Sequence, residues 1–159
     1  MTLFRSFYYN HYEIQDKYVD YWQYVSQKLT KNPYVVGFDP FNEPIPGAEN
    51  LGGLLKMLLP GNFDKYQLQP MYERIFGKYK EASSENIMMF EPSQFPDAGP
   101  IGSKGMVNHL GFTEPPGAKF GSANHVLNDH DYCGDGVSNC CDDTGVPFKS
   151  SEALCLAWH

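Results

Sequence analysis

The apolar positions of this chain alternate between helical and strand-like spacing. Between Tyr12 and Leu29 they recur every three or four residues, which predicts a helix with one buried face. Asn32-Pro33 predicts the end of this helix, because a residue that precedes proline disfavours helical backbone. The expected buried face consists of Ile14, Tyr18, Tyr21 or Trp22, Val25 and Leu29.

Three apolar stretches predict strands. Residues 34–41 are apolar almost without alternation, which is typical of a parallel strand covered on both faces. Residues 87–90 form a second short apolar run, which closes on Glu91-Pro92. His125 opens a third strand, which is expected to end within residues 128–132.

A second helix is predicted between the first two strands, with Asp64 as its N-terminal cap. The order of helix, strand, helix, strand, loop and strand indicates an α/β fold with a parallel sheet. Ser150 or Ser151 would cap a further helix near the end of the sequence. The apolar face of the second helix consists of Leu68, Met71, Tyr72, Ile75, Phe76 and Tyr79.

Two long connections interrupt this pattern. The leucine-rich insertion that reaches Gly61 predicts a short helix packed on the body, or alternatively a lid or groove for a lipid tail. Residues 96–121 are rich in glycine and proline and predict a long irregular loop. A loop of that length in a compact domain is typical of a functional segment.

Composition narrows the range of partners. The chain has 159 residues and a formal net charge of -7, which argues against nucleic acid as a partner. No apolar run approaches the roughly 20 residues that a membrane-spanning helix needs. Residues 1–10 do not have the apolar core of a signal peptide, so a secreted or lumenal location would require a signal upstream of Met1.

The four cysteines all lie in the last part of the sequence. They are interpreted as free or locally paired thiols, and the sequence cannot choose among their pairings. A calcium loop is a weaker alternative, since residues 131–142 approach the EF-hand spacing but Cys133 replaces an oxygen ligand. The cysteines are Cys133, Cys140, Cys141 and Cys155.

Candidate catalytic residues follow the predicted strands. Asn42-Glu43-Pro44 comes after the first strand and presents a carboxylate in a proline-rich turn. His130 and Tyr132 are two residues apart at the end of the third strand, so they would point to the same face. Glu91 also ends a strand and by position could face the cleft; it is interpreted as a structural or substrate-adjacent residue with no assigned chemical role.

Three segments carry a resemblance to a known family. The stretches VVGFDPFNEPIPG, FDKYQLQPMYERI and VLNDHDYC resemble glycoside hydrolase family 5, the cellulase-like enzymes, and in particular its endoglycoceramidase branch. The resemblance implies a partial (β/α)8 barrel, from about the third helix to the start of the sixth. Because a complete barrel has about 250 residues, residues 1–159 would form a central fragment of the catalytic domain.

The resemblance also implies roles for individual residues. Glu43 would be the general acid/base of a retaining hydrolase, and Asn42 would bond the 2-hydroxyl of the sugar. Tyr132 would bond the nucleophile, and His130 would line the sugar site. The nucleophile expected after the seventh strand is not found, because Glu152 lies at a predicted helix start. The chain alone is therefore expected to be inactive.

The resemblance implies glycosylceramides as substrates, and it implies that the protein contacts a membrane surface. A polysaccharide hydrolase of the cellulase or mannanase type is the alternative within the same enzyme class. A truncated, non-catalytic protein that binds glycolipid is the alternative outside it. Paired carboxyl groups suffice for glycoside hydrolysis, so no metal or organic cofactor is expected.

Overall fold

A computed structural model describes five segments of the chain, residues 3–59, 61–82, 85–93, 111–121 and 123–128. Within them, three parallel strands form one sheet in the order β1-β2-β3. The strands are β1 (Gly37–Phe38), β2 (Ile87–Phe90) and β3 (His125–Leu127). The predicted α/β pattern with a parallel sheet is confirmed.

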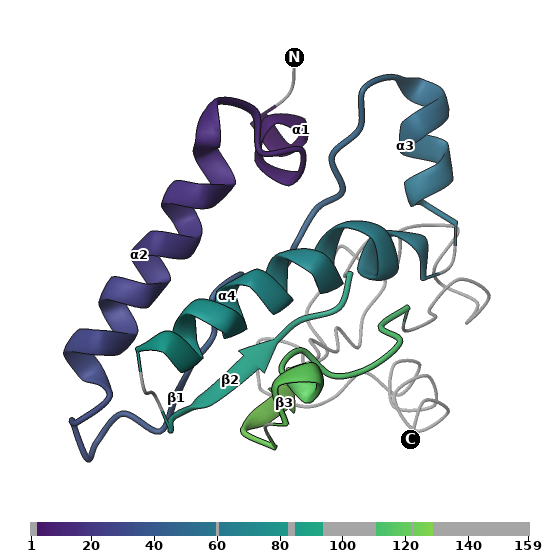
Figure 1. Ribbon diagram of the computed structural model, residues 1–159. Coiled ribbons are helices and arrows are strands. Elements are labelled where there is room, and N and C mark those ends of the chain that lie inside the picture. The colour runs from purple at the N-terminus through teal and green to yellow at the C-terminus, as the bar shows by residue number, and fades with distance from the viewer. Residues whose placement is uncertain (1–2, 60, 83–84, 94–110, 122, 129–159) are drawn as a thin grey trace, which may run out of the picture.

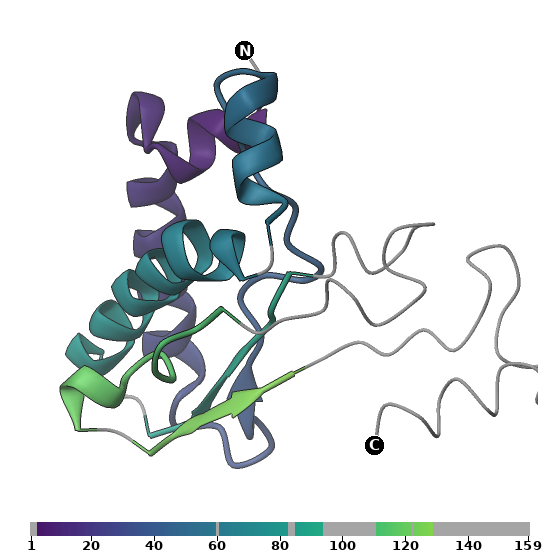
Figure 2. The same cartoon turned by 90° about the vertical axis from the view of Figure 1, so that its right-hand side faces the viewer.

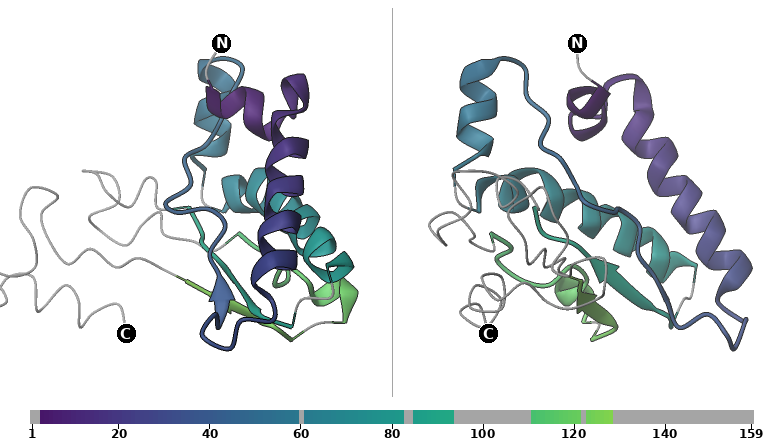
Figure 3. Two further views of the ribbon diagram at one scale, coloured as in Figure 1. Left: turned by 90° about the vertical axis from the view of Figure 1, so that its left-hand side faces the viewer. Right: turned by 180° about the vertical axis from the view of Figure 1, so that it is seen from behind.

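Helices connect the strands. The described elements are α1 (Leu3–Tyr8), η1 (His11–Glu13), α2 (Ile14–Leu29), α3 (Leu51–Met57), the π-helical η2 (Asp64–Leu68), α4 (Gln69–Glu81) and the 3-10 turn η3 (Ala118–Phe120). The long helices α2 and α4 lie on the same side of the sheet (Figures 1 and 2). They contact each other from the middle to the C-terminal end of α4, where Arg74 donates to Asp16 and Gln23 donates to Glu81, so they form one helical layer (Figure 3).

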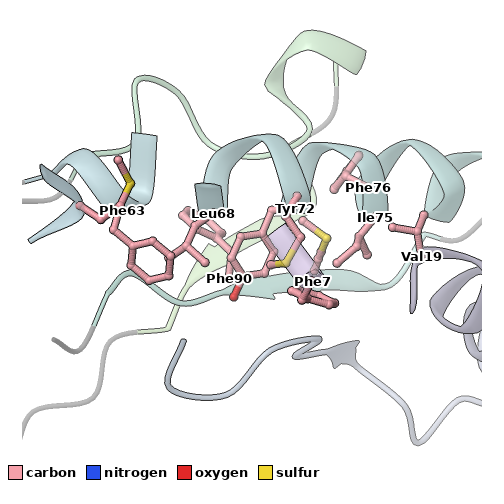
Figure 4. Packing of buried hydrophobic residues seen from close by; sticks show 11 residues of the cluster. Phe7, Val19, Phe63, Leu68, Tyr72, Ile75, Phe76 and Phe90 are labelled. Carbon is pink, nitrogen blue, oxygen red and sulfur yellow. The ribbon is translucent and has the colours of Figure 1, made fainter. Parts of the chain in front are cut away.

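The core lies between this helical layer and the sheet. The six apolar residues predicted for the face of α4 and its preceding turn are all at most 2% exposed. Figure 4 shows Leu68, Tyr72 and Ile75 along the helix, with Phe63 at one end and Phe90 beneath them. The sequence-based prediction of this helix and its buried face is confirmed. The residues recur at the helical period over about three turns.

The buried face of α2 agrees with the expected one in large part, because Ile14, Tyr18 and Trp22 pack against the core. Val19, Gln15 and Ser26 are buried, whereas Tyr21 and Leu29 are exposed. The face differs from the prediction in that two polar residues also pack inward. Gln15 donates a hydrogen bond to the carbonyl of Phe7 at 3.2 Å, and Ser26 donates one to the carbonyl of Gln23 at 2.8 Å. Satisfied polar groups can be buried at little cost, which hydrophobic periodicity alone does not reveal.

The first strand is much shorter than predicted. The sequence indicates a strand over residues 34–41, but only two residues have strand pairing. Tyr34 and Val36 are 91% and 67% exposed, so the described part of the chain does not cover both faces of this segment. Phe38 is buried, and its ring meets Tyr79 edge-on at 5.5 Å.

A polar junction fixes the N-terminal segment against both long helices. Asn10 donates a hydrogen bond of 2.8 Å to one carboxylate oxygen of Asp16, and the amide of Asp16 donates one of 3.0 Å back to Asn10. Arg74 of α4 donates to the other carboxylate oxygen of Asp16. These bonds hold the carboxyl pKa of Asp16 below its usual value, with the Asn10 bond as the largest cause.

The leucine-rich insertion forms the short helix that was expected, but most of its apolar side chains are not packed. Asn50 caps α3 by accepting a hydrogen bond of 2.9 Å from the amide of Gly53. Met57 is buried, whereas Leu51, Leu55 and Leu59 are 56–71% exposed. The helix projects from the body on the side toward which the strands run (Figure 1).

Candidate active site

Each of the three strands is followed at once by a polar residue, and these three residues meet. Asp39 follows β1, Glu91 follows β2 and Asn128 follows β3. The side-chain amide of Asn128 donates hydrogen bonds to Asp39 at 2.6 Å and to Glu91 at 3.4 Å. Glu91 is only 1% exposed. We call these three residues the strand-end cluster.

The turn after β1 carries Asn42 and Glu43 and is bonded to this cluster through the amide of Glu43. Asn42 is exposed and Glu43 is half-buried, while Pro40 and Pro44 on either side are buried. The backbone of Glu43 has φ 46°, in the left-handed region that residues with a Cβ rarely adopt. The turn therefore holds a carboxylate between two buried prolines in an unusual backbone conformation.

Hydrogen bonds from three elements hold this turn. Tyr18 of α2 donates its hydroxyl to the carbonyl of Pro40, and Tyr72 of α4 donates to the carbonyl of Phe41 at 3.2 Å. The amide of Glu43 donates to Oε2 of Glu91 at 2.6 Å. Two helices and a strand end thus determine where residues 40–43 lie.

The two tyrosines that support the turn remain protonated at physiological pH. Burial raises the pKa of Tyr72, which is fully enclosed by the core, and burial is also the main cause that raises the pKa of Tyr18. A protonated hydroxyl can donate and accept at once. Tyr72 does both, because its oxygen also accepts the amide of Glu91 at 3.0 Å.

The chain beyond Glu43 is fixed by a side-chain amide. Gln67 donates to the carbonyl of Gly47 at 2.6 Å and accepts the amide of Gly47 at 3.1 Å. A Cβ at position 47 would lie 2.6 Å from the backbone of Phe4, so glycine is required there by close approach. The turn that carries Glu43 is anchored at both of its ends.

Asp64 has a different role from the predicted one. It lies inside the helical turn η2 and does not cap a helix. Its carboxylate, 2% exposed, accepts the amide of Ser93 at 2.8 Å and the amide of Gly111 at 2.9 Å. The side chain therefore joins the segment after β2 to the segment that begins at residue 111.

The structure describes two of the four residues that the sequence analysis assigned to the site. Asn42 and Glu43 lie beside the strand-end cluster, whereas His130 and Tyr132 fall outside the described residues. The cysteines, the calcium-like loop and the helix expected after Ser150 also fall outside them. Within the described segments, no group of three or more acidic, histidine or cysteine side chains could hold a metal ion.

Sequence reasoning gave Glu91 no chemical role, and it did not single out Asp39 or Asn128. A usable signal was present, because each is the first polar residue after an apolar strand-like run. In parallel α/β sheets the residues at the carboxyl ends of neighbouring strands lie together.

Within the described part of the chain, no helix has the length and apolar character needed to cross a bilayer.

Comparisons with known proteins agree with this arrangement. An endoglycoceramidase from Hydra vulgaris is 28% identical over 129 residues, which is 81% of this chain but 23% of that protein. The crystal structure of an endogalactoceramidase superposes with a TM-score of 0.60 at 20% identity, covering 98% of this chain and 30% of the solved one. This chain spans less than a third of either protein. The family profile described as cellulase, glycosyl hydrolase family 5, matches residues 2–146, and the chain therefore belongs to that family.

Proposed function

We propose that the protein hydrolyses O-glycosidic bonds with retention of configuration, with Glu43 as the general acid/base. The observation that carries this proposal is the placement of Glu43 at the carboxyl ends of parallel strands, next to an exposed Asn42. In (β/α)8 barrels the catalytic residues collect at this face. The three strands would then be neighbouring strands of such a barrel, and residues 1–159 a central part of the catalytic domain.

Glu43 has the surroundings that acid/base catalysis needs. Its side chain is half-buried, so it can reach both a bound sugar and water. It would protonate the glycosidic oxygen as the bond breaks, and then take a proton from the water that releases the sugar. Asn42, whose amide is exposed, would hydrogen-bond a sugar hydroxyl beside the reacting carbon.

The retaining reaction also needs a carboxylate nucleophile. Glu91 does not suit this role, because it is 1% exposed and its two oxygens accept hydrogen bonds from Glu43 and Asn128. We assign no residue of this chain as the nucleophile. His130 and Tyr132 are proposed to line the sugar site and to bond the nucleophile, respectively.

A glycosylceramide is the proposed substrate. The relatives support this choice, and so does α3, which carries exposed leucines at positions 51 and 55 on the side toward which the strands run. The spacing of four residues places Leu51 and Leu55 on one helical face, which can contact a ceramide tail or a lipid surface. Cellulose- or mannan-like polysaccharides are the second candidate, because the matching family profile is that of cellulases.

The test uses the full-length protein that contains this chain. It should release sugar from glycosylceramide in mixed vesicles, and Glu43→Gln should lower kcat/KM by about 100-fold or more. Asn124→Ala, which removes an amide that bonds the exposed Glu85, should leave kcat/KM unchanged. Full activity in Glu43→Gln would reject the proposed mechanism, and hydrolysis of soluble glucans alone would favour the second candidate.

A further inference from the structure

We propose that Glu91 is a positioning residue that holds the backbone of Glu43 in its left-handed conformation and so aims the acid/base carboxyl group. The inference rests on the proposed function of Glu43. It assigns Glu91 no contact with substrate. The role is carried by one hydrogen bond of 2.6 Å, from the amide of Glu43 to Oε2 of Glu91.

The conformation of Glu43 needs such support. At φ 46° the Cβ of a residue approaches the following carbonyl oxygen, and this conformation is unfavourable without compensating contacts. Residues in strained backbone conformations persist only where contacts with the surrounding structure hold them in that conformation. A short bond to a carboxylate is stronger than one to a neutral acceptor, and it acts on the residue whose φ is unusual.

Glu91 is itself held firmly. It is 1% exposed, its Oε1 lies 3.4 Å from the amide of Asn128, and its backbone amide donates to Tyr72 at 3.0 Å. The same Tyr72 hydroxyl donates to Phe41, two residues before Glu43. The acceptor for the Glu43 amide is therefore part of a fixed frame built from β2, β3 and α4.

Loss of Glu91 should have different effects on glycosides with different leaving groups. If Glu91 aims the general acid, its loss should affect glycosides that need a protonated leaving group much more than those that do not. An alkyl or ceramide glycoside has a poor leaving group, whereas a dinitrophenyl glycoside releases a stable phenolate. A general loss of structure would reduce kcat/KM for both substrates alike.

The experiment compares kcat/KM for these two substrates, with the same sugar, in variants of the full-length protein. Glu91→Ala should lose on the order of 100-fold on the alkyl glycoside and less than about tenfold on the dinitrophenyl glycoside. Glu91→Asp keeps the carboxyl group but moves it back by one methylene, so this variant should lose more activity on the alkyl glycoside than on the dinitrophenyl glycoside, as Glu91→Ala does. Glu91→Gln can still accept the Glu43 amide and should stay within about tenfold of the parent on both.

Asp64→Ala is the matched control, because it removes another buried carboxylate that accepts backbone amides but does not contact Glu43. It should lower both rates equally. Equal losses for the two substrates in Glu91→Ala and Glu91→Asp would overturn the inference, as would failure of all three Glu91 variants to fold. If Glu43→Gln itself shows no dependence on the leaving group, the proposed function fails instead.

Discussion

Asn128 donates a hydrogen bond of 2.6 Å to Asp39, although the two residues follow strands that are not neighbours in the sheet. The bond passes over the end of β2, where Glu91 lies. One amide thus serves two carboxylates, and it links the ends of all three strands.

Removal of that amide should destabilise the sheet. In Asn128→Ala the carboxylates of Asp39 and Glu91 lose their shared donor, which should cost about 1–3 kcal/mol of unfolding free energy. Urea unfolding of the full-length protein would measure it. Asn124→Ala is the control on β3's amino side. Its amide bonds the exposed Glu85, so we expect a smaller effect, of about 0.5 kcal/mol. Similar losses in the two variants would contradict a special role for the strand-end cluster.

Tyr72 and Tyr79 offer a matched pair on one helix. Both are buried and both donate to a carbonyl, Tyr72 to Phe41 and Tyr79 to Ile87. Each Tyr→Phe change should lower stability by about 1 kcal/mol. Only Tyr72→Phe should also lower kcat, because only that hydroxyl supports the turn of Glu43. Equal kcat values in the two variants would argue against this support.

Features that are set by residues close together in the sequence were predicted, whereas features that are set by contacts between distant residues were not. The buried face of α4 follows from helical spacing within about three turns, so residues 68–79 were predicted correctly. The short strand β1 was not, because the exposure of Val36 depends on what lies across the sheet. The bond between Glu43 and Glu91 joins residues 48 positions apart and depends on the register of β1 and β2. No pattern among neighbouring residues of the sequence predicts such a bond.

The junction at Asp16 should give the protein a measurable acid dependence. The pKa of Asp16 is lowered in the folded state, so its contribution to stability is present above the unfolded pKa of about 4 and is lost as pH falls through the folded pKa. Asp16→Asn should therefore melt at a lower temperature than the parent at pH 7. Thermal melts down the pH scale should show the two curves converging below about pH 4. A constant difference between them would contradict this assignment.

Gly47 should not tolerate a side chain. Alanine there would place its Cβ 2.6 Å from the backbone of Phe4 and would disturb the two hydrogen bonds between Gln67 and Gly47. We therefore expect the free energy of unfolding, measured in urea, to fall by about 1–3 kcal/mol. Gly52→Ala is the opposite case. Its Cβ would meet only Asn50 at 3.4 Å, and alanine favours helix, so α3 should gain up to about 1 kcal/mol. A neutral Gly47→Ala would show that the contact with α1 can relax.

The exposed leucines of α3 allow the proposed lipid contact to be separated from catalysis. Leu51→Ser with Leu55→Ser removes apolar surface that is already exposed, so folding should be little affected. If this face contacts the lipid, the double variant should lose roughly tenfold or more in activity on glycosylceramide in vesicles, since each leucine can contribute about 1.5–3 kcal/mol on full burial. Activity on a soluble aryl glycoside with the same sugar should not change. Tyr34→Ser, which removes an exposed apolar residue before β1, controls for general effects of surface polarity. Equal losses on both substrates would instead place the leucines in the support of the active site, and unchanged activity on both would remove α3 from the argument for a lipid substrate.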